Sequence, residues 1–331
     1  MLEALCIRSQ YVAMSDKHPS TDPRGIFADD ALARLATGHR LDAFHPIDGG
    51  IGAEFVAENL LAPLALALPR FEARADIAMR GTFHDRLWTA ASGHVFGRFM
   101  APLFGIPATG RIAHIRFGCF QNWHDGKVAE TIVLLDLPSL MMQAGVWPLS
   151  PPMGPLLMAP GPAGGGGVWP DAAAESPASL ALVEAMIGGL MRYDGAGLAK
   201  MGMTSFWSDD FWWYGPGPIG SFRGHRDYER GHQLPFLTAF PDRVGGNHRA
   251  RFGDGHFIAS TGWPSITATH KGGGWLGLAP SDRVITMRVM DFWRRDGDSL
   301  VENWVMIDIP DLLSQIGIDV FARAAALSDR S

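Results

Sequence analysis

The chain contains one twelve-residue pattern twice. Leu134–Gly145 reads LLDLPSLMMQAG, and Met306–Gly317 reads MIDIPDLLSQIG. Both copies run from apolar residues into Asp-Xaa-Pro and then into a second apolar run. The first run predicts a buried strand, and the residues after the proline predict a short helix.

The same spacing continues upstream of this pattern. Asp136 and Asp308 are 172 positions apart, and the same offset joins other glycine, proline, charged and aromatic positions. The pairs are Glu130 with Glu302, Phe120 with Phe292, Arg111 with Arg283, Gly105 with Gly277, Pro69 with Pro241, Pro63 with Pro235 and Gly52 with Gly224. One fixed offset over so many positions is improbable by chance, so the sequence predicts two copies of one domain in tandem.

A segment of different composition separates the two copies. Residues 147–177 are rich in proline and glycine, which disfavour regular helices and strands, so this composition predicts a linker. We therefore expect a first domain at residues 1–146, a linker at 147–177 and a second domain at 178–331. The first copy has no clear counterpart of the helix expected at 180–193, and its N-terminal end is predicted to be reduced or replaced.

Within each copy, helical patterns come first and strands follow. The expected helices are residues 52–68 and 223–239, and the expected strands are 112–123, 128–135, 284–294 and 300–307. Asp125-Gly126 and Asp296-Gly297 fall between successive strands, and Asp-Gly is a strong hairpin signal. Helices followed by an antiparallel meander predict an α+β fold rather than alternating βα units.

Composition limits the function. The 331 residues are 47% hydrophobic and 19% charged, with a net charge of −6 and no block of like charge. This excludes wholesale disorder and gives no nucleic-acid or membrane footprint. Cys6 and Cys119 alone form no disulfide framework, and the histidines lack metal-site spacing, so we expect no metal. No apolar run approaches the roughly 18 residues of a membrane span, and we expect a soluble, cytoplasmic protein.

Several motifs carry a family resemblance. The first copy has Trp88, Gly93-His94-Val-Phe-Gly97, FGIPATGR at 104–111 and DGKVAE at 125–130. The second has FRGHRDY at 222–228, AFPDRV at 239–244 and LGLAPSDR at 276–283. Together with the repeated Asp-Xaa-Pro stretch, they resemble the SnoaL-like polyketide cyclases of the NTF2-like and ketosteroid-isomerase-like superfamily. The resemblance implies two conical α+β barrels, each a curved antiparallel sheet wrapped around helices, with a pocket inside the cone.

The resemblance also implies a catalytic residue. Enzymes of this family carry an acid/base aspartate on the last strand of the cone, and the matching positions are Asp136 and Asp308. A second polar group lies 14 positions earlier, where characterised cyclases have histidine. This chain has Asn122 and Arg294 there, which departs from the cyclase pattern.

An aspartate in an apolar strand suits acid/base chemistry. Burial raises the pKa of a carboxyl group toward neutrality, where it can both remove and return a proton. Such a group can close a ring by an intramolecular aldol reaction, or isomerise a hydrophobic carbonyl compound, without a cofactor. A dense aromatic cluster at Trp207 and Phe211–Tyr214 could line a pocket for a flat, aromatic ligand. Donors and pocket-lining groups for the ligand are expected among His45, Trp88, His94, Asn122, Trp212, Tyr214, Trp263, His270 and Arg294. The alternative is that each aspartate caps the helix after it.

Three functions stay open at this stage. The first is a cofactor-independent cyclase or isomerase active in one or both domains, with a role in polyketide metabolism. The second is a non-catalytic ligand-binding or scaffold protein, because this fold class supports many roles. The third, weaker one is an epoxide-type hydrolase that uses Asp308 and Arg294. We expect either a homodimer or a monomer whose two domains form an internal pseudo-dimer.

Overall fold

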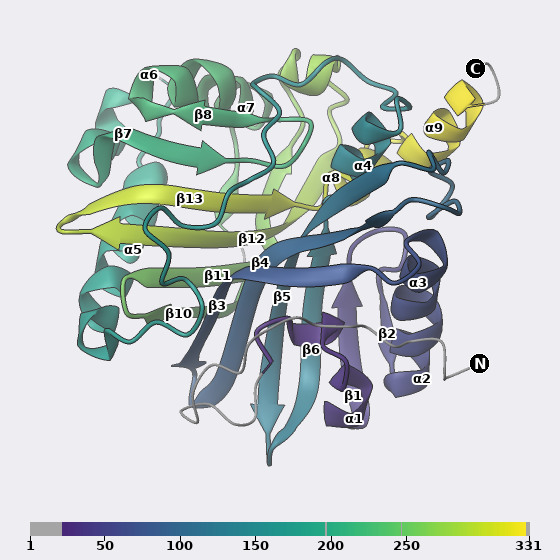
Figure 1. Ribbon diagram of the computed structural model, residues 1–331. Coiled ribbons are helices and arrows are strands. Elements are labelled where there is room, and N and C mark those ends of the chain that lie inside the picture. Colours follow the sequence, from purple (N-terminus) through teal and green to yellow (C-terminus); the bar gives the residue numbers. More distant parts are fainter. Residues whose placement is uncertain (1–21, 196, 246, 329–331) are drawn as a thin grey trace. The chain divides into compact units, whose positions relative to one another are not determined.

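The computed structural model describes residues 22–195, 197–245 and 247–328 (Figure 1). Its contacts divide the chain into two compact units. The N-terminal domain comprises residues up to Trp147 together with Gly165–Trp169 and the segment from Phe321. The C-terminal domain comprises Pro148–Gly164 and Pro170–Val320. Cys6 lies outside the described residues.

The N-terminal domain is built on a six-stranded sheet of order β2-β1-β6-β5-β4-β3. β1 pairs in parallel with β6, and its other strand pairs are antiparallel. Its elements are η2 (Gly25–Phe27), α1 (Ala31–Arg34), β1 (Leu35–Ala43), β2 (Gly49–Ile51), α2 (Ala53–Val56), the π-helix η3 (Ala57–Leu61), α3 (Ala62–Ala67), β3 (Glu72–Phe83), β4 (Arg86–Arg98), β5 (Ile112–His124), β6 (Lys127–Leu135) and α4 (Leu137–Gln143).

The C-terminal domain has the corresponding order, β8-β7-β13-β12-β11-β10, with the short β9 also paired to β11. Its elements are η4 (Ala173–Glu175), α5 (Ser176–Leu190), η5 (Ala199–Met201), η6 (Met203–Ser205), β7 (Trp207–Tyr214), β8 (Ser221–Arg223), α6 (Gly224–Tyr228), the π-helix η7 (Glu229–Gln233), α7 (Leu234–Ala239), β9 (Val244–Gly245), β10 (His248–Asp254), β11 (Phe257–Thr269), η8 (Trp275–Gly277), β12 (Val284–Asp296), β13 (Ser299–Ile307) and α8 (Ile309–Gln315). The last helix, α9 (Val320–Ser328), begins where this domain ends.

The two domains are copies of one topology. Matching elements begin 172 positions apart, among them β1 and β7, β5 and β12, and α4 and α8. Both sheets are curved, and helices accompany each of them (Figure 1). The predicted α+β class and tandem repeat are therefore confirmed.

The predicted hairpins form at matching positions of the two domains, but the Asp-Gly dipeptide occupies the turn in only one of them. In the N-terminal domain, Asp125 and Gly126 form the turn and both have positive φ, as a two-residue hairpin loop requires. In the C-terminal domain, Asp296 still pairs with Ser299, so Gly297 and Asp298 form the turn instead of Asp296-Gly297. These two positions match Asp125 and Gly126 in the repeat, and the same pairing irregularity precedes both turns, before Trp123 and before Arg295. The Asp-Gly dipeptide, not the turn, is displaced by one residue.

The predicted linker region is hydrogen-bonded to the domains along much of its length. Its first part belongs to the C-terminal domain, where the indole nitrogen of Trp304 donates to the Pro160 carbonyl over 2.8 Å. Its Gly165–Trp169 stretch belongs to the N-terminal domain. There Ala78 on β3 donates to Gly167 and accepts from Trp169, each over 2.8 Å. In the described part of the chain, no helix is long and apolar enough to cross a membrane.

Candidate active site in the C-terminal domain

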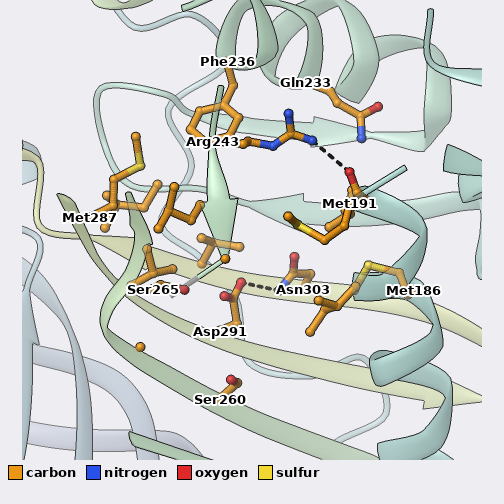
Figure 2. Close-up of a pocket in the computed structure, with 18 of the residues that line it drawn as sticks. Met186, Met191, Gln233, Phe236, Arg243, Ser260, Ser265, Met287, Asp291 and Asn303 are labelled. Atoms are coloured by element: carbon orange, nitrogen blue, oxygen red, sulfur yellow. Dashed lines mark hydrogen bonds between the residues drawn. The ribbon is translucent and has the colours of Figure 1, made fainter. Parts of the chain in front are cut away.

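A cavity of about 200 Å³ lies within the C-terminal domain. One side is formed by α5 and by the continuous helix η7–α7, and the other by the inner face of the sheet, from β10 to β13. Much of the wall is apolar, and it includes Met186, Met191, Met203, Met287 and Phe236 (Figure 2). Such a cavity favours a hydrophobic ligand, and its few polar groups determine what chemistry is available.

Asp291 lies on the sheet side of this cavity, in the middle of β12 (Figure 2). Burial raises the pKa of this carboxyl group to about 7, although a hydrogen bond from Asn303 and the charge of Arg251 both oppose the shift. The amide nitrogen of Asn303 lies 3.5 Å from Asp291 Oδ1 and also donates to the Phe292 carbonyl over 3.0 Å. A carboxyl group with a pKa near 7 has both its acid and its base form populated at neutral pH.

Asp291 belongs to a polar row that crosses three strands. Arg251 on β10 is paired with Ser260 on β11, and Ser260 is paired with Asp291 on β12. The Nε atom of Arg251 donates to the Ser260 hydroxyl over 3.3 Å, and its Nη2 lies 3.0 Å from His248 Nδ1. Burial, and then the nearby Arg251 charge, lowers the pKa of His248 to about 4. His248 is therefore neutral at pH 7, and the positive charge that acts on Asp291 is that of Arg251.

The helical side of the cavity presents Tyr228, His232 and Gln233. His232 and Gln233 lie in the π-helix η7, and π-helical turns are often found at functional sites. The His232 ring stacks on Trp213 at 4.1 Å between centroids, and burial lowers its pKa to about 3, so it is a neutral imidazole. Burial, and then the charge of Asp291, raises the pKa of Tyr228 above its usual range, which keeps its hydroxyl protonated as a donor.

Asp136 and Asp308, the predicted catalytic residues, both cap helices. Asp136 Oδ1 accepts from the Ser139 backbone over 3.1 Å at the start of α4. Asp308 Oδ1 accepts from the Asp311 backbone over 3.2 Å at the start of α8, and its Oδ2 accepts from Arg288 over 3.1 Å. Asp308 is not among the residues that line the cavity. The capping interpretation therefore describes what both side chains do.

The ligand-contacting residues predicted for the second copy lie outside the cavity lining. Trp212 and Tyr214 flank Trp213, which does line it, and successive residues of a strand point to opposite faces. Their own rings stack on each other at 5.8 Å. Arg294 donates to Glu302 over 2.5 Å, whereas Asp308 pairs with Arg288, so the two groups of the predicted hydrolase site bind different partners.

The remaining two candidates of that copy are also engaged elsewhere. Trp263 lies under Arg288, with the guanidinium carbon 5.1 Å from the ring centroid. His270 is buried, its Nδ1 lies 3.1 Å from the Ser281 hydroxyl, and its ring packs on Phe240.

The candidates of the first copy are distributed over its sheet and loops. Trp88 is buried opposite Asn122, whose side-chain amide donates to the Leu87 carbonyl over 3.1 Å. His94 lies 3.1 Å from an Asp76 carboxylate oxygen, measured from Nδ1. His45 makes a similar contact with Asp48 over 3.2 Å in the β1–β2 connection. His45, Trp88 and His94 thus each contact a different partner.

The matching space in the N-terminal domain is filled. Cys119 takes the place of Asp291 in β5, and it is 1% exposed beside a gap of about 10 Å³. Gly25 of η2 passes so close that a Cβ there would lie 2.9 Å from the sulfur of Cys119, at a φ of +59° that also favours glycine. Phe27 of the same segment packs edge-on against Phe117 at 4.9 Å. This segment occupies the region that is open around Asp291.

One feature of the sequence distinguishes Asp291. It interrupts an apolar stretch, VMDFW, just as Asp136 and Asp308 interrupt theirs, but no family motif marks it. The repeat does not indicate Asp291 either, because the matching position 119 is a cysteine. Among the described residues, no group of three or more His, Cys, Asp or Glu side chains is arranged to hold a metal ion.

The chain is similar to several solved structures, whereas the sequence comparisons find no match. No protein-family model matches the chain, and no curated protein matches it significantly. IdmH from Streptomyces antibioticus, provisionally named a polyketide cyclase, is 21% identical with a TM-score of 0.33; the match covers 41% of this chain and 99% of that one.

Two further matches are of the same kind. An NTF2-like protein from Burkholderia xenovorans LB400 is 15% identical with a TM-score of 0.34, covering 43% of this chain and 98% of that one. A protein from Jannaschia sp. CCS1, provisionally named a SnoaL-like polyketide cyclase, is 22% identical with a TM-score of 0.29, covering 34% and 75%. The similar structures are thus SnoaL-like and NTF2-like proteins, as the sequence motifs predict, and each match is about one domain long.

Proposed function

We propose that the C-terminal domain is a cofactor-independent acid/base enzyme that acts on a hydrophobic carbonyl compound, with Asp291 as the proton carrier. The observation that carries this proposal is a carboxyl group with a pKa of about 7 inside a largely apolar cavity. This keeps the chemistry expected from the sequence and moves it from Asp308, which caps α8, to Asp291.

The reaction proposed is an intramolecular aldol closure or the related isomerisation. The Asp291 carboxylate removes a proton from the carbon beside a carbonyl group, which gives an enolate. In the closure, the enolate carbon forms a bond to a second carbonyl carbon of the same molecule. The resulting alkoxide takes back the proton from the Asp291 carboxylic acid, so the group ends as it began. In an isomerisation, the proton returns to a different carbon.

Neutral donors around Asp291 suit the oxyanion of such an enolate. The Tyr228 hydroxyl stays protonated because its pKa is raised, and it lines the same cavity. Asn303 holds Asp291 Oδ1 by its side-chain amide, which fixes the carboxyl group on the sheet. Donors that are already in place for a developing negative charge are often the largest single contribution to such catalysis.

The test uses a simple ketone because the natural substrate is unknown. The methyl protons of 2-acetonaphthone exchange with D2O, and mass spectrometry follows the exchange. We expect the wild-type chain to accelerate it and Asp291→Asn to remove about 100-fold or more of that acceleration, in the usual range for a general base. The wild-type rate should rise with pH through about 7, as the carboxyl group ionises.

Asp308→Asn is the matched control. Asparagine also caps helices, and residue 308 lies outside the cavity lining, so its exchange rate should equal that of the wild type. Equal rates for wild type and Asp291→Asn would contradict the proposal. Binding of the ketone without any exchange would also contradict it, and would favour a non-catalytic ligand-binding protein.

A further inference from the structure

Gln233 carries a buried side-chain amide that faces the cavity. Its side chain lines the cavity, the residue is 4% exposed, and neither Oε1 nor Nε2 has a hydrogen-bond partner within the described residues. An unsatisfied buried donor or acceptor destabilises the fold, so retaining both at one position points to a ligand that satisfies them. That ligand must offer an acceptor and a donor side by side.

Arg243 supplies a positive charge at the same end of the cavity. Figure 2 shows its guanidinium beside Gln233, across the cavity from Asp291 and Asn303. One of its nitrogens donates to the Leu190 carbonyl over 2.8 Å, and its guanidinium carbon lies 5.3 Å from the Tyr193 ring centroid. In the described part of the chain, no carboxylate pairs with Arg243. A half-buried guanidinium with donors to spare binds an oxyanion well.

The two polar ends lie on opposite sides of an apolar middle. Met191 and Met287 lie between the Gln233–Arg243 end and the Asp291 end in Figure 2. A ligand that meets both ends therefore needs an apolar body between its polar groups. The volume of about 200 Å³ is below the roughly 300–1,000 Å³ typical of sites for drug-sized molecules, so the body is small.

We propose that this cavity binds small aromatic hydroxycarboxylates. The ligand's carboxylate contacts Arg243, and one carboxylate oxygen together with the neighbouring hydroxyl group contacts Gln233. The carboxylate accepts from the guanidinium and from Gln233 Nε2, and the hydroxyl donates to Gln233 Oε1. This proposal rests on the proposed function only in that both use the same cavity. It concerns the ligand groups bound at the end of the cavity away from Asp291. In a substrate of this class, the reacting carbonyl would extend from the aromatic body toward Asp291.

Titration calorimetry of the full chain at pH 6 tests the proposal with two naphthalene probes. We expect 3-hydroxy-2-naphthoate, which has both groups, to bind more tightly than 2-naphthoate, which lacks the hydroxyl. Arg243→Met should weaken both probes about 10-fold or more, since a charge-assisted hydrogen bond is lost. Gln233→Leu, which copies Leu61 of the first domain, should remove the preference for the hydroxyl.

Three controls separate this proposal from folding and from catalysis. Arg226→Met changes an exposed arginine of α6 and should leave binding unchanged, whereas Arg243→Lys keeps the charge and should restore part of the affinity. Asp291→Asn should keep naphthoate binding within about 3-fold even where it abolishes exchange, so the two proposals fail separately. Equal affinity of the wild type and Arg243→Met, or no binding of either probe by the wild type, would overturn the assignment.

Discussion

The two domains have the same strand order and differ at matching positions inside the cone. In the C-terminal domain, a cross-strand row reads Arg251, Ser260, Asp291. The corresponding row of the N-terminal domain reads Ala78, Ala91, Cys119. The matching π-helices differ in the same way, with His232-Gln233 in one and Leu60-Leu61 in the other.

This difference distinguishes the side chains that the fold requires from those that the proposed chemistry requires. Both sheets form with either row, because strand pairing is made by the backbone and either set of side chains can be buried. The N-terminal domain gains a filled interior, closed by Phe27 and the passage of Gly25. The C-terminal domain keeps a cavity and the unsatisfied polar groups that line it. Apolar packing and a cavity lined by polar groups are thus alternatives at the same positions of one scaffold.

The largest effect is expected from placing the acid in the filled domain. Cys119→Asp puts a carboxyl group where burial already raises the pKa of the thiol to about 12 and where about 10 Å³ is free. We expect a loss of roughly 3–5 kcal/mol in the stability of the N-terminal domain, because no partner or cavity receives the group. Hydrogen exchange measured by mass spectrometry localises the loss to that domain. Cys119→Ala is the control and should lose much less stability. Equal protection from hydrogen exchange in Cys119→Asp and wild type would contradict the expected difference between the two domains.

An intermediate effect is expected from the pH dependence of stability in the C-terminal domain. The pKa of Asp291 is about 7 in the folded chain, against about 3.9 for an unfolded aspartate. Between these values the folded state holds a proton that the unfolded state has released, so its stability falls as pH rises from about 4 to 7 and then levels off. Asp291→Asn removes this loss and should be more stable than wild type at pH 8 by roughly 4 kcal/mol, because the two pKa values differ by about 3 units.

Thermal unfolding at pH 4 and pH 8 measures this difference. At pH 4 the two proteins should have nearly the same melting temperature, because Asp291 is protonated in the wild type. Asp209→Asn changes an exposed aspartate of β7 and serves as the control. If Asp291→Asn gained no stability over the wild type between pH 4 and pH 8, burial of the ionised Asp291 carboxyl group would not destabilise the folded state.

The smallest effect is expected at the two helix caps, where the domains are alike. Asp136→Ala removes the acceptor for a backbone amide at the start of α4, which costs about 1 kcal/mol. Asp308→Ala removes the same kind of acceptor at the start of α8 and also the carboxylate that pairs with Arg288, so it should cost more. Asparagine restores the acceptor, so each Asp→Asn change should cost less than its Asp→Ala partner. Urea unfolding of the four variants gives these differences. An Asn variant as unstable as the corresponding Ala variant would argue against capping.

The fold could be predicted from the sequence because several independent signals agree. The 172-residue offset sets the number of domains, and the Asp-Gly and Asp-Xaa-Pro dipeptides mark where strands turn or end. These signals are local, and each has a backbone cause. The hairpin of β12 and β13 shows their limit, since its turn keeps the repeat position, Gly297-Asp298, although the Asp-Gly dipeptide lies one residue earlier.

The site was harder to predict because it depends on which side of a strand each residue faces. Trp213 lines the cavity and Trp212 does not, and Asp291 lines it while Arg294 does not. A shift of one residue reverses such an assignment, and partial alternation in the sequence does not fix it. The repeat favoured positions that the two domains share, such as Asp136 and Asp308, whereas the proposed chemistry lies at positions where they differ.

The methionines of the cavity wall have a consequence for substrate range. Met186, Met191, Met203 and Met287 are unbranched, and their thioether chains can turn about three bonds to follow the outline of a ligand. A wall of this kind adapts to ring systems of different shape with little loss of contact. Under the proposed function, selection among ligands then depends on the two polar ends, and the site would accept related aromatic compounds that differ in their central rings.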